Sequence, residues 1–121
     1  MININFRDPR PIYEQVRDSF RQLILSGVLP PAYKMPSVRE LASQLAINPN
    51  TIQRAYRELE KEGYICSVPG RGSFVCKTDS AVEARKKELL EKLQGLVKEL
   101  RLIGVSEKEM EAIWKGENDS D

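Results

Sequence analysis

Apolar residues recur along the first part of the chain with a helical period. Before residue 26 they stand three and four positions apart, which is the spacing of one face of an amphipathic helix. The residues of this face are Ile12, Val16, Phe20, Leu23 and Ile24. Gly27 and the Pro30-Pro31 pair follow directly and cannot continue a helix. The pattern therefore predicts a first helix that begins near Ile12 and ends before Gly27.

Two further helices are predicted on either side of a short break. Ser37 and Glu40 have the spacing of a capping box, in which each side chain bonds the other residue's free backbone N–H, and the helix they open runs to Leu45. Asn48 can cap the next helix and Pro49 suits its first position. We expect that helix to run from about Pro49 to Glu62, with Gly63 as its terminator.

A β-hairpin is predicted after the third helix. The segments 64–68 and 73–77 are rich in β-prone residues and flank Pro69-Gly70-Arg71-Gly72. If the turn centres on Gly70-Arg71, Cys66 lies opposite Val75. Because side chains alternate along a strand, the thiols of Cys66 and Cys76 then point to opposite faces. We therefore expect no disulfide within the hairpin.

From about Ser80 the period changes to that of a coiled-coil seam. Apolar residues alternate at spacings of four and three, with Leu90 and Val97 widening the face. The predicted seam consists of Leu89, Leu93, Leu96, Val97, Leu100 and Ile103. Gly104 ends this helix, Ser106 with Glu109 opens a short one that carries Met110 and Trp114, and an acidic tail follows over 117–121.

Composition narrows the range of functions. The 121 residues include no histidine, which excludes a histidine-dependent catalytic triad and a Cys/His zinc site. No nucleophile elbow, P-loop or metal cluster is present either, so we expect neither an enzyme nor a bound cofactor. No apolar run is long enough to span a membrane, and the N-terminus has no signal-peptide pattern, which favours the cytoplasm.

Charge is distributed unevenly along the chain. Residues 1–78 carry 11 Lys/Arg and 7 Asp/Glu, a balance of +4, while residues 79–121 carry 8 and 11, a balance of −3. A basic front half suits a polyanionic partner. The order of helix, short helix, tight break, helix and hairpin predicts a mainly α fold with a small β-hairpin, a winged helix-turn-helix. We expect this DNA-binding domain over 1–78 and a helical dimerisation tail over 79–121.

The same segments resemble the GntR family of bacterial regulators. The resemblance covers about residues 10 to 76 and rests on 26–31 (SGVLPP), 35–42 (MPSVRELA), 47–52 (INPNTI), 54–56 (RAY), 59–60 (LE), 62–63 (EG) and 70–75 (GRGSFV). The opening 11–16 (PIYEQV) and the short tail are similar to the YtrA subfamily. Two positions depart from the family pattern: Ala32 stands where glycine is usual, and Met35 where leucine is usual.

The resemblance implies DNA contacts at particular positions. The recognition helix, about 49–62, would lie in the major groove, and the wing tip, 69–72, in the minor groove. The expected contacts are Arg39, Asn48, Asn50, Thr51, Gln53, Arg54, Arg57, Gly70, Arg71 and Gly72. Asn, Gln and Arg side chains can bond base edges, and the free N–H groups of a first helical turn can bind phosphate.

We therefore expect a sequence-specific regulator of transcription, in the form of a repressor. It would bind double-stranded DNA as a homodimer on a pseudo-palindromic operator, since two-fold pairing doubles the base pairs that are read. The seam could instead pack on its own domain, and the winged fold could hold a protein partner without DNA specificity. A small-molecule effector would have to bind in a crevice, which Met110 and Trp114 could line, although core packing is the simpler role for both.

Overall fold

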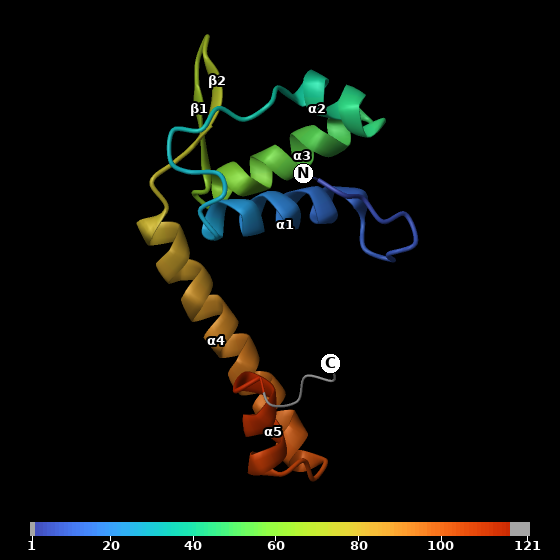
Figure 1. Cartoon of the computed structure of the whole chain (residues 1–121), viewed down its shortest axis with the longest axis vertical. Coiled ribbons are helices and arrows are strands. Elements are labelled where there is room, and N and C mark those ends of the chain that lie inside the picture. Colours follow the sequence, from blue (N-terminus) through green and yellow to red (C-terminus); the bar gives the residue numbers. More distant parts are fainter. Residues whose placement is uncertain (1, 117–121) are drawn as a thin grey trace. The chain divides into compact units, whose positions relative to one another are not determined.

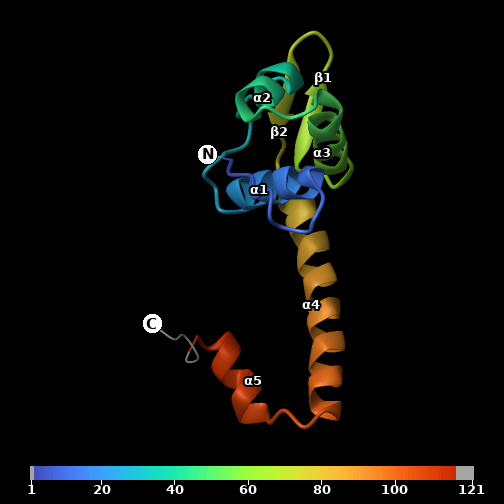
Figure 2. The same ribbon diagram turned by 90° about the vertical axis from the view of Figure 1, so that its right-hand side faces the viewer.

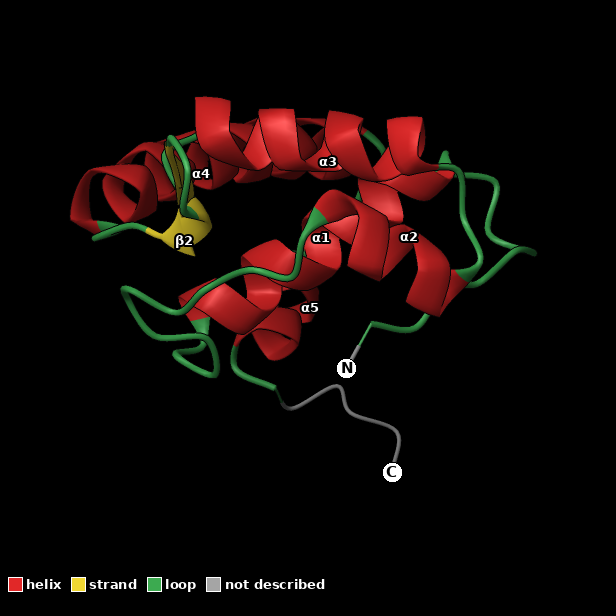
Figure 3. Cartoon of the chain, turned by 90° about the horizontal axis from the view of Figure 1, so that it is seen from above, coloured by secondary structure: helices red, strands yellow, loops and turns green. Residues whose placement is uncertain are grey.

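The computed structural model describes residues 2–116, so the acidic tail 117–121 lies outside the described residues. Helices make up most of it, and two strands form one short hairpin (Figures 1 and 3). The elements in chain order are α1 (Ile12–Leu25), α2 (Val38–Leu45), α3 (Pro49–Lys61), β1 (Ile65–Val68), β2 (Gly72–Val75), α4 (Asp79–Leu102) and α5 (Glu107–Trp114). The predicted fold class is confirmed.

The chain divides into two compact units, Met1–Val82 and a second that begins at Glu83. The division falls inside α4, just after its first turn, whereas the sequence placed the domain boundary after residue 78. Ala81 explains the difference, because it is only 7 % exposed and belongs to the core of the first unit.

The core of the first unit lies between α1 and α3. Val16 and Phe20 from α1 and Ile52 and Leu59 from α3 are completely buried, and the Phe20 ring packs edge-to-face on Tyr56 at 5.9 Å between centroids. Helix α2 and the hairpin close the remaining sides of this core. Burial of large apolar side chains at about 1.5–3 kcal/mol each is the main stabilising contribution to the unit.

The predicted helix starts are confirmed by their caps. The amide of Glu40 donates to Ser37 Oγ and the amide of Ser37 donates to Glu40 Oε1, both at 3.1 Å, which completes the capping box of α2. Hydrogen bonds from the backbone and hydroxyl of Ser37 lower the pKa of the Glu40 carboxyl. At α3, Asn48 Oδ1 accepts from the amide of Asn50 at 2.8 Å, and Pro49 occupies the first helical position.

The hairpin is extended by the segment that precedes α2. Strands β1 and β2 pair antiparallel, and the amide of Met35 donates to Ser73 O at 2.8 Å while the amide of Val75 donates to Tyr33 O at 2.9 Å. These bonds attach the loop 32–35 to the outer edge of β2. The hairpin is thereby anchored in the first unit, with Val75 and Met35 buried.

The expectation of two cysteines on opposite faces is wrong. The structure joins Cys66 and Cys76 by a disulfide across the hairpin, with their Cα atoms 5.7 Å apart. Val68 pairs with Gly72 and Cys66 pairs with Phe74. Three residues, 69–71, therefore lie between the last paired residues, whereas a turn centred on Gly70-Arg71 has an even number. A shift of one residue in register moves a side chain to the other face. Cys66 therefore lies diagonally opposite Cys76 on the same face.

Ala32 has a backbone conformation that glycine adopts more easily. Its φ is +72°, in the left-handed region, where an L side chain crowds the following carbonyl at a cost of roughly 1–2 kcal/mol. Its amide donates to Val75 O at 2.8 Å, which keeps the loop against β2 in this conformation. The need for a positive φ explains why glycine is usual at this position, while Met35 fills the core in place of leucine.

The second unit consists of the rest of α4 together with α5. Ser106 caps α5 by accepting from the amide of Glu109 at 3.1 Å, and Met110 is the residue of α5 that is buried. The predicted seam of α4 remains largely uncovered, with Leu96 60 % and Ile103 72 % exposed. No helix among the described residues is long and apolar enough to cross a lipid bilayer.

Candidate nucleic-acid interface

Helices α2 and α3 are joined by a tight turn that fixes their mutual orientation. Ala46 ends α2 in the left-handed conformation, with φ +55°. The amide of Ile47 then donates to Ala42 O at 2.9 Å, and Asn48 already caps α3. The two helices pack on each other within the first unit, and this geometry presents the first turn of α3 to solvent.

Helix α3 buries one side and exposes the other. Its inner side contributes Ile52, Ala55 and Leu59 to the core, while Asn50, Gln53 and Arg57 are exposed. Thr51, in the first turn, is half-buried. The exposed side therefore offers amides and a guanidinium, which can bond base edges or phosphates in a major groove about 12 Å wide.

The other predicted contact residues lie at two further places on the same unit. Arg39 is exposed on the first turn of α2, and Arg71 is exposed at the tip of the hairpin. Gly70 and Gly72 have φ of +77° and +107°, so the tip depends on residues without a side chain. Figures 1 and 2 both show α2 and the hairpin tip on the same side of α1.

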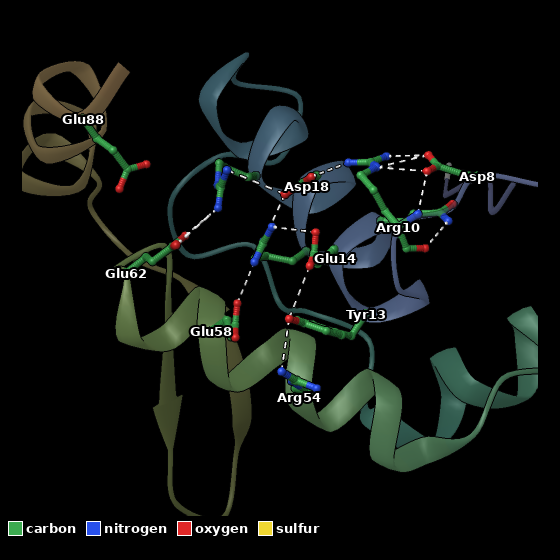
Figure 4. A network of polar contacts seen from close by, with 12 residues as sticks. Asp8, Arg10, Tyr13, Glu14, Asp18, Arg54, Glu58, Glu62 and Glu88 are labelled. Atoms are coloured by element: carbon green, nitrogen blue, oxygen red, sulfur yellow. Dashed lines mark hydrogen bonds and ion pairs between the residues drawn. The ribbon is translucent and has the colours of Figure 1, made fainter. Parts of the chain in front are cut away.

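Arg54 differs from the other predicted contact residues. Its guanidinium carbon lies 3.7 Å from the centroid of the Tyr13 ring, and its Nη2 donates to the Tyr13 hydroxyl at 3.1 Å (Figure 4). Arg54 is exposed, but it is directed along the flank of α3 toward α1. In the sequence, Tyr13 stands within the family-like segment 11–16, and its position there indicates no role of its own. Periodicity alone cannot pair an arginine with an aromatic residue that lies two helices earlier in the chain.

Two ion pairs connect α1 to α3 beyond Arg54. Arg17 Nη1 lies 2.7 Å from Glu58 Oε1, and Arg21 Nη2 lies 3.0 Å from Glu62 Oε1. Partial burial of Arg17 opposes its charge, but hydrogen bonds to Glu58 and Asp18 outweigh this and raise its pKa above the usual value. The acidic residues of α3 that face α1 are thus paired with arginines, which reduces their repulsion of a phosphate backbone.

The second unit presents an apolar cleft beside the predicted seam. The cleft has a volume of about 580 Å³ and is lined by Leu93, Gln94, Val97, Arg101 and Trp114. The Arg101 guanidinium is occupied by a bidentate pair with Glu107, with Nε–Oε1 at 2.6 Å and Nη2–Oε2 at 3.2 Å. Of the two residues considered for an effector crevice, Trp114 lines this cleft and Met110 is buried.

A short helix, a left-handed turn, a helix with an exposed polar side and a glycine-tipped hairpin together define a winged helix-turn-helix protein. Residues 12–75 match the model of the bacterial regulatory proteins of the gntR family. The chain is 40 % identical over 107 residues to the HTH-type transcriptional repressor YtrA of Bacillus subtilis, covering 87 % of this chain and 82 % of that one. The protein therefore belongs to the GntR family of bacterial regulatory proteins, in its YtrA-like group.

Solved structures agree with this assignment. A GntR family transcriptional regulator from Listeria monocytogenes is 33 % identical, covers 92 % of this chain and 98 % of its own, and superposes with a TM-score of 0.74. The DNA-binding domain of AraR, solved in complex with operator ORX1, is 31 % identical. It covers 62 % of this chain and 96 % of its own, with a TM-score of 0.56.

Proposed function

We propose that this protein is a cytoplasmic transcriptional repressor that binds a pseudo-palindromic double-stranded operator as a homodimer. Helix α3 enters the major groove, and the wing tip 69–72 enters the adjacent minor groove. One observation carries the proposal. The first half of α3 exposes polar side chains such as Asn50 and Gln53, although the opposite side of the same helix is fully used in the core. The likeness to a domain solved in complex with an operator supports binding to DNA.

Specific readout is assigned to the side chains that remain free to reach a groove. Asn50 and Gln53 offer amides that suit adenine, and Arg57 offers a guanidinium that suits guanine or phosphate. Arg39 and Asn48 contact the flanking backbone, with Thr51 at the positively polarised start of α3. Arg71 inserts from the wing, where Gly70 and Gly72 allow the backbone to approach closely.

The dimer interface is assigned to the apolar face of α4. Its residues are Leu89, Leu93, Leu96, Val97, Leu100 and Ile103. Leu93 and Val97 also line the cleft beside α5, so the face and the cleft form one continuous apolar surface. A large exposed apolar surface marks an interaction site on a protein that must remain soluble. A second copy of the chain covers this surface in the proposal, and a small-molecule effector would bind where the two copies meet.

A fluorescence-anisotropy titration tests the proposal directly. The probe is the duplex from upstream of the protein's own gene, compared with a scrambled duplex at two salt concentrations. We expect preferential binding at two chains per duplex, with an affinity that falls steeply with salt because phosphates are neutralised. Equal or absent binding to both duplexes, followed by failure of a random-sequence selection, would contradict the proposal and favour a winged module that binds protein.

A further inference from the structure

Three contacts join α1 to α3 at intervals of one helical turn, and together we call them the α1–α3 ladder. Each connects residues that are 41 positions apart, and successive partners advance by four residues on both helices (Figure 4). The rungs are Tyr13–Arg54, Arg17–Glu58 and Arg21–Glu62, where Glu62 is the C-cap residue of α3 and is counted with it here. Because residues four apart share one helix face, the ladder follows a single line along the flank of α3.

The first rung reverses the charge arrangement of the other two. In the second and third rungs α1 provides the arginine and α3 the carboxylate, so the charges of α3 are neutralised there. In the first rung α3 provides the arginine, and the partner from α1 is a neutral aromatic ring. Within residues 2–116, the ion pairs near the ladder are made by Arg10, Arg17 and Arg21, and none involves Arg54.

The geometry of the first rung holds Arg54 while leaving its charge available. A guanidinium has five N–H donors, and the contact with the Tyr13 hydroxyl at 3.1 Å uses one of them. Stacking on the ring at 3.7 Å restricts the rotamers of a long side chain that would otherwise lose freedom on binding. Tyr13 is itself half-buried on α1, and its hydroxyl donates to Glu14 Oε2 at 3.5 Å.

We propose that Tyr13 is a positioning residue that holds the Arg54 guanidinium for contact with a phosphate of the operator backbone. Arg54 directly follows Gln53, which faces the base edges in the proposed function, and the phosphates that border a major groove lie at the flanks of the helix that occupies it. The inference rests on the proposed function, since it names how one side chain of that interface is prepared. It also assigns Arg54 to phosphate rather than to a base.

A double-mutant cycle on the full-length protein tests the coupling. The variants are Tyr13→Leu, Arg54→Gln and the pair, each measured for operator affinity across a salt series and for its thermal midpoint. We expect Tyr13→Leu to weaken binding about 3- to 10-fold by freeing one long side chain. It should have no further effect once Arg54→Gln is present. Arg54→Gln should reduce the slope of log K against log salt by about 0.9, and by the same amount on every operator variant.

Two more variants separate positioning from simple stabilisation. Glu62→Gln cuts the third rung and serves as the matched control: its midpoint falls, and its operator affinity stays within about twofold because no phosphate contact is involved. Arg54→Lys keeps the charge but loses the planar stacked fork, so it should lose as much affinity as Tyr13→Leu. Because Arg54 is exposed, this variant reports on the inference even if Tyr13→Leu unfolds.

Three kinds of result would contradict parts of this proposal. The role of Tyr13 would be overturned if Tyr13→Leu and Arg54→Gln lowered operator affinity independently, so that their effects multiplied in the double variant. It would also be overturned if Tyr13→Leu or Arg54→Lys bound the operator as tightly as wild type. Either result would leave the proposed function intact. If Arg54→Gln lowered the affinity by different amounts on operators with different base sequences, the assignment of Arg54 to a phosphate would be overturned. A wild-type protein that binds no duplex, including duplexes from random selection, would overturn the proposed function and this inference together.

Discussion

The two units of the chain treat their apolar residues in opposite ways. In the first unit, Phe20, Ile52 and Leu59 are completely buried, so its core is complete within one chain. In the second, Leu96, Leu102 and Ile103 are between 60 % and 79 % exposed. Both patterns follow a helical period in the sequence. A helical period therefore identifies an apolar face of a helix, whereas burial of that face within the chain depends on whether other elements pack against it.

The largest expected effect concerns the core of the first unit. Leu59→Ala should lower the free energy of unfolding by about 2–5 kcal/mol, because it leaves a cavity in a fully buried site. The measurement is chemical denaturation followed by circular dichroism. Leu102→Ala, at a leucine of α4 that is 79 % exposed, is the control and should change little. Equal losses for the two variants would remove the distinction between the units.

The disulfide of the wing gives the next effect, again confined to the first unit. Reduction of Cys66–Cys76 should lower the free energy of unfolding by about 3 kcal/mol, since the bond restricts a short loop of the unfolded chain. Thermal scans with and without a phosphine reductant measure it. The double variant Cys66→Ser/Cys76→Ser should unfold at the reduced midpoint and show no response to reductant. A wild-type midpoint that ignores reductant would contradict the bridge.

A substitution on the apolar face of the second unit should weaken the association of two chains rather than lower the free energy of unfolding. Leu93→Lys should weaken pairing by about 2 kcal/mol or more, as expected for a buried interface residue, while the unfolding of the first unit stays the same. Sedimentation velocity over a concentration series measures the shift toward monomer. Glu91→Gln changes the net charge by the same amount without touching the seam and should sediment like wild type. If Leu93→Lys sedimented like wild type, the apolar face of α4 would not be a dimer interface and would instead pack on its own chain.

The smallest effect concerns the loop that edges the hairpin. Ala32→Gly should raise the free energy of unfolding by about 0.5–1 kcal/mol, because glycine adopts the observed φ of +72° without strain. Denaturation in urea is sensitive enough to detect it. Ala84→Gly, in the interior of α4, should have the opposite sign. Destabilisation by both substitutions would mean that the flexibility of glycine in the unfolded chain outweighs the relieved strain.

The sequence predicted most of the fold because the decisive signals are local. Ser37 with Glu40, and Asn48 with Pro49, locate two helix starts through bonds within four residues of chain. The exposed polar residues of α3 follow from the same helical period that defines its core. Resemblance to a known family added the wing, whose glycines alone are equally consistent with an ordinary turn.

What the sequence could not predict depends on contacts between distant elements or on a single position of register. The turn of the hairpin has three residues rather than two, and that one residue brings Cys66 and Cys76 onto one face. The helical period places Arg54 on an exposed side, but Tyr13, 41 residues earlier, determines where its guanidinium lies. Neither property has a local signal in the chain.

A complete core in the first unit has a consequence for the dosage of the regulator. The first unit has the core it needs to fold without a partner, so under the proposed pairing a cell would contain a reservoir of monomers with a folded first unit at low expression. Occupancy of a two-fold operator then rises with the square of the monomer concentration until the site saturates. A twofold change in synthesis would be read as nearly a fourfold change in bound operator. The uncovered face of α4 would thus make the genetic response sharper without any effector.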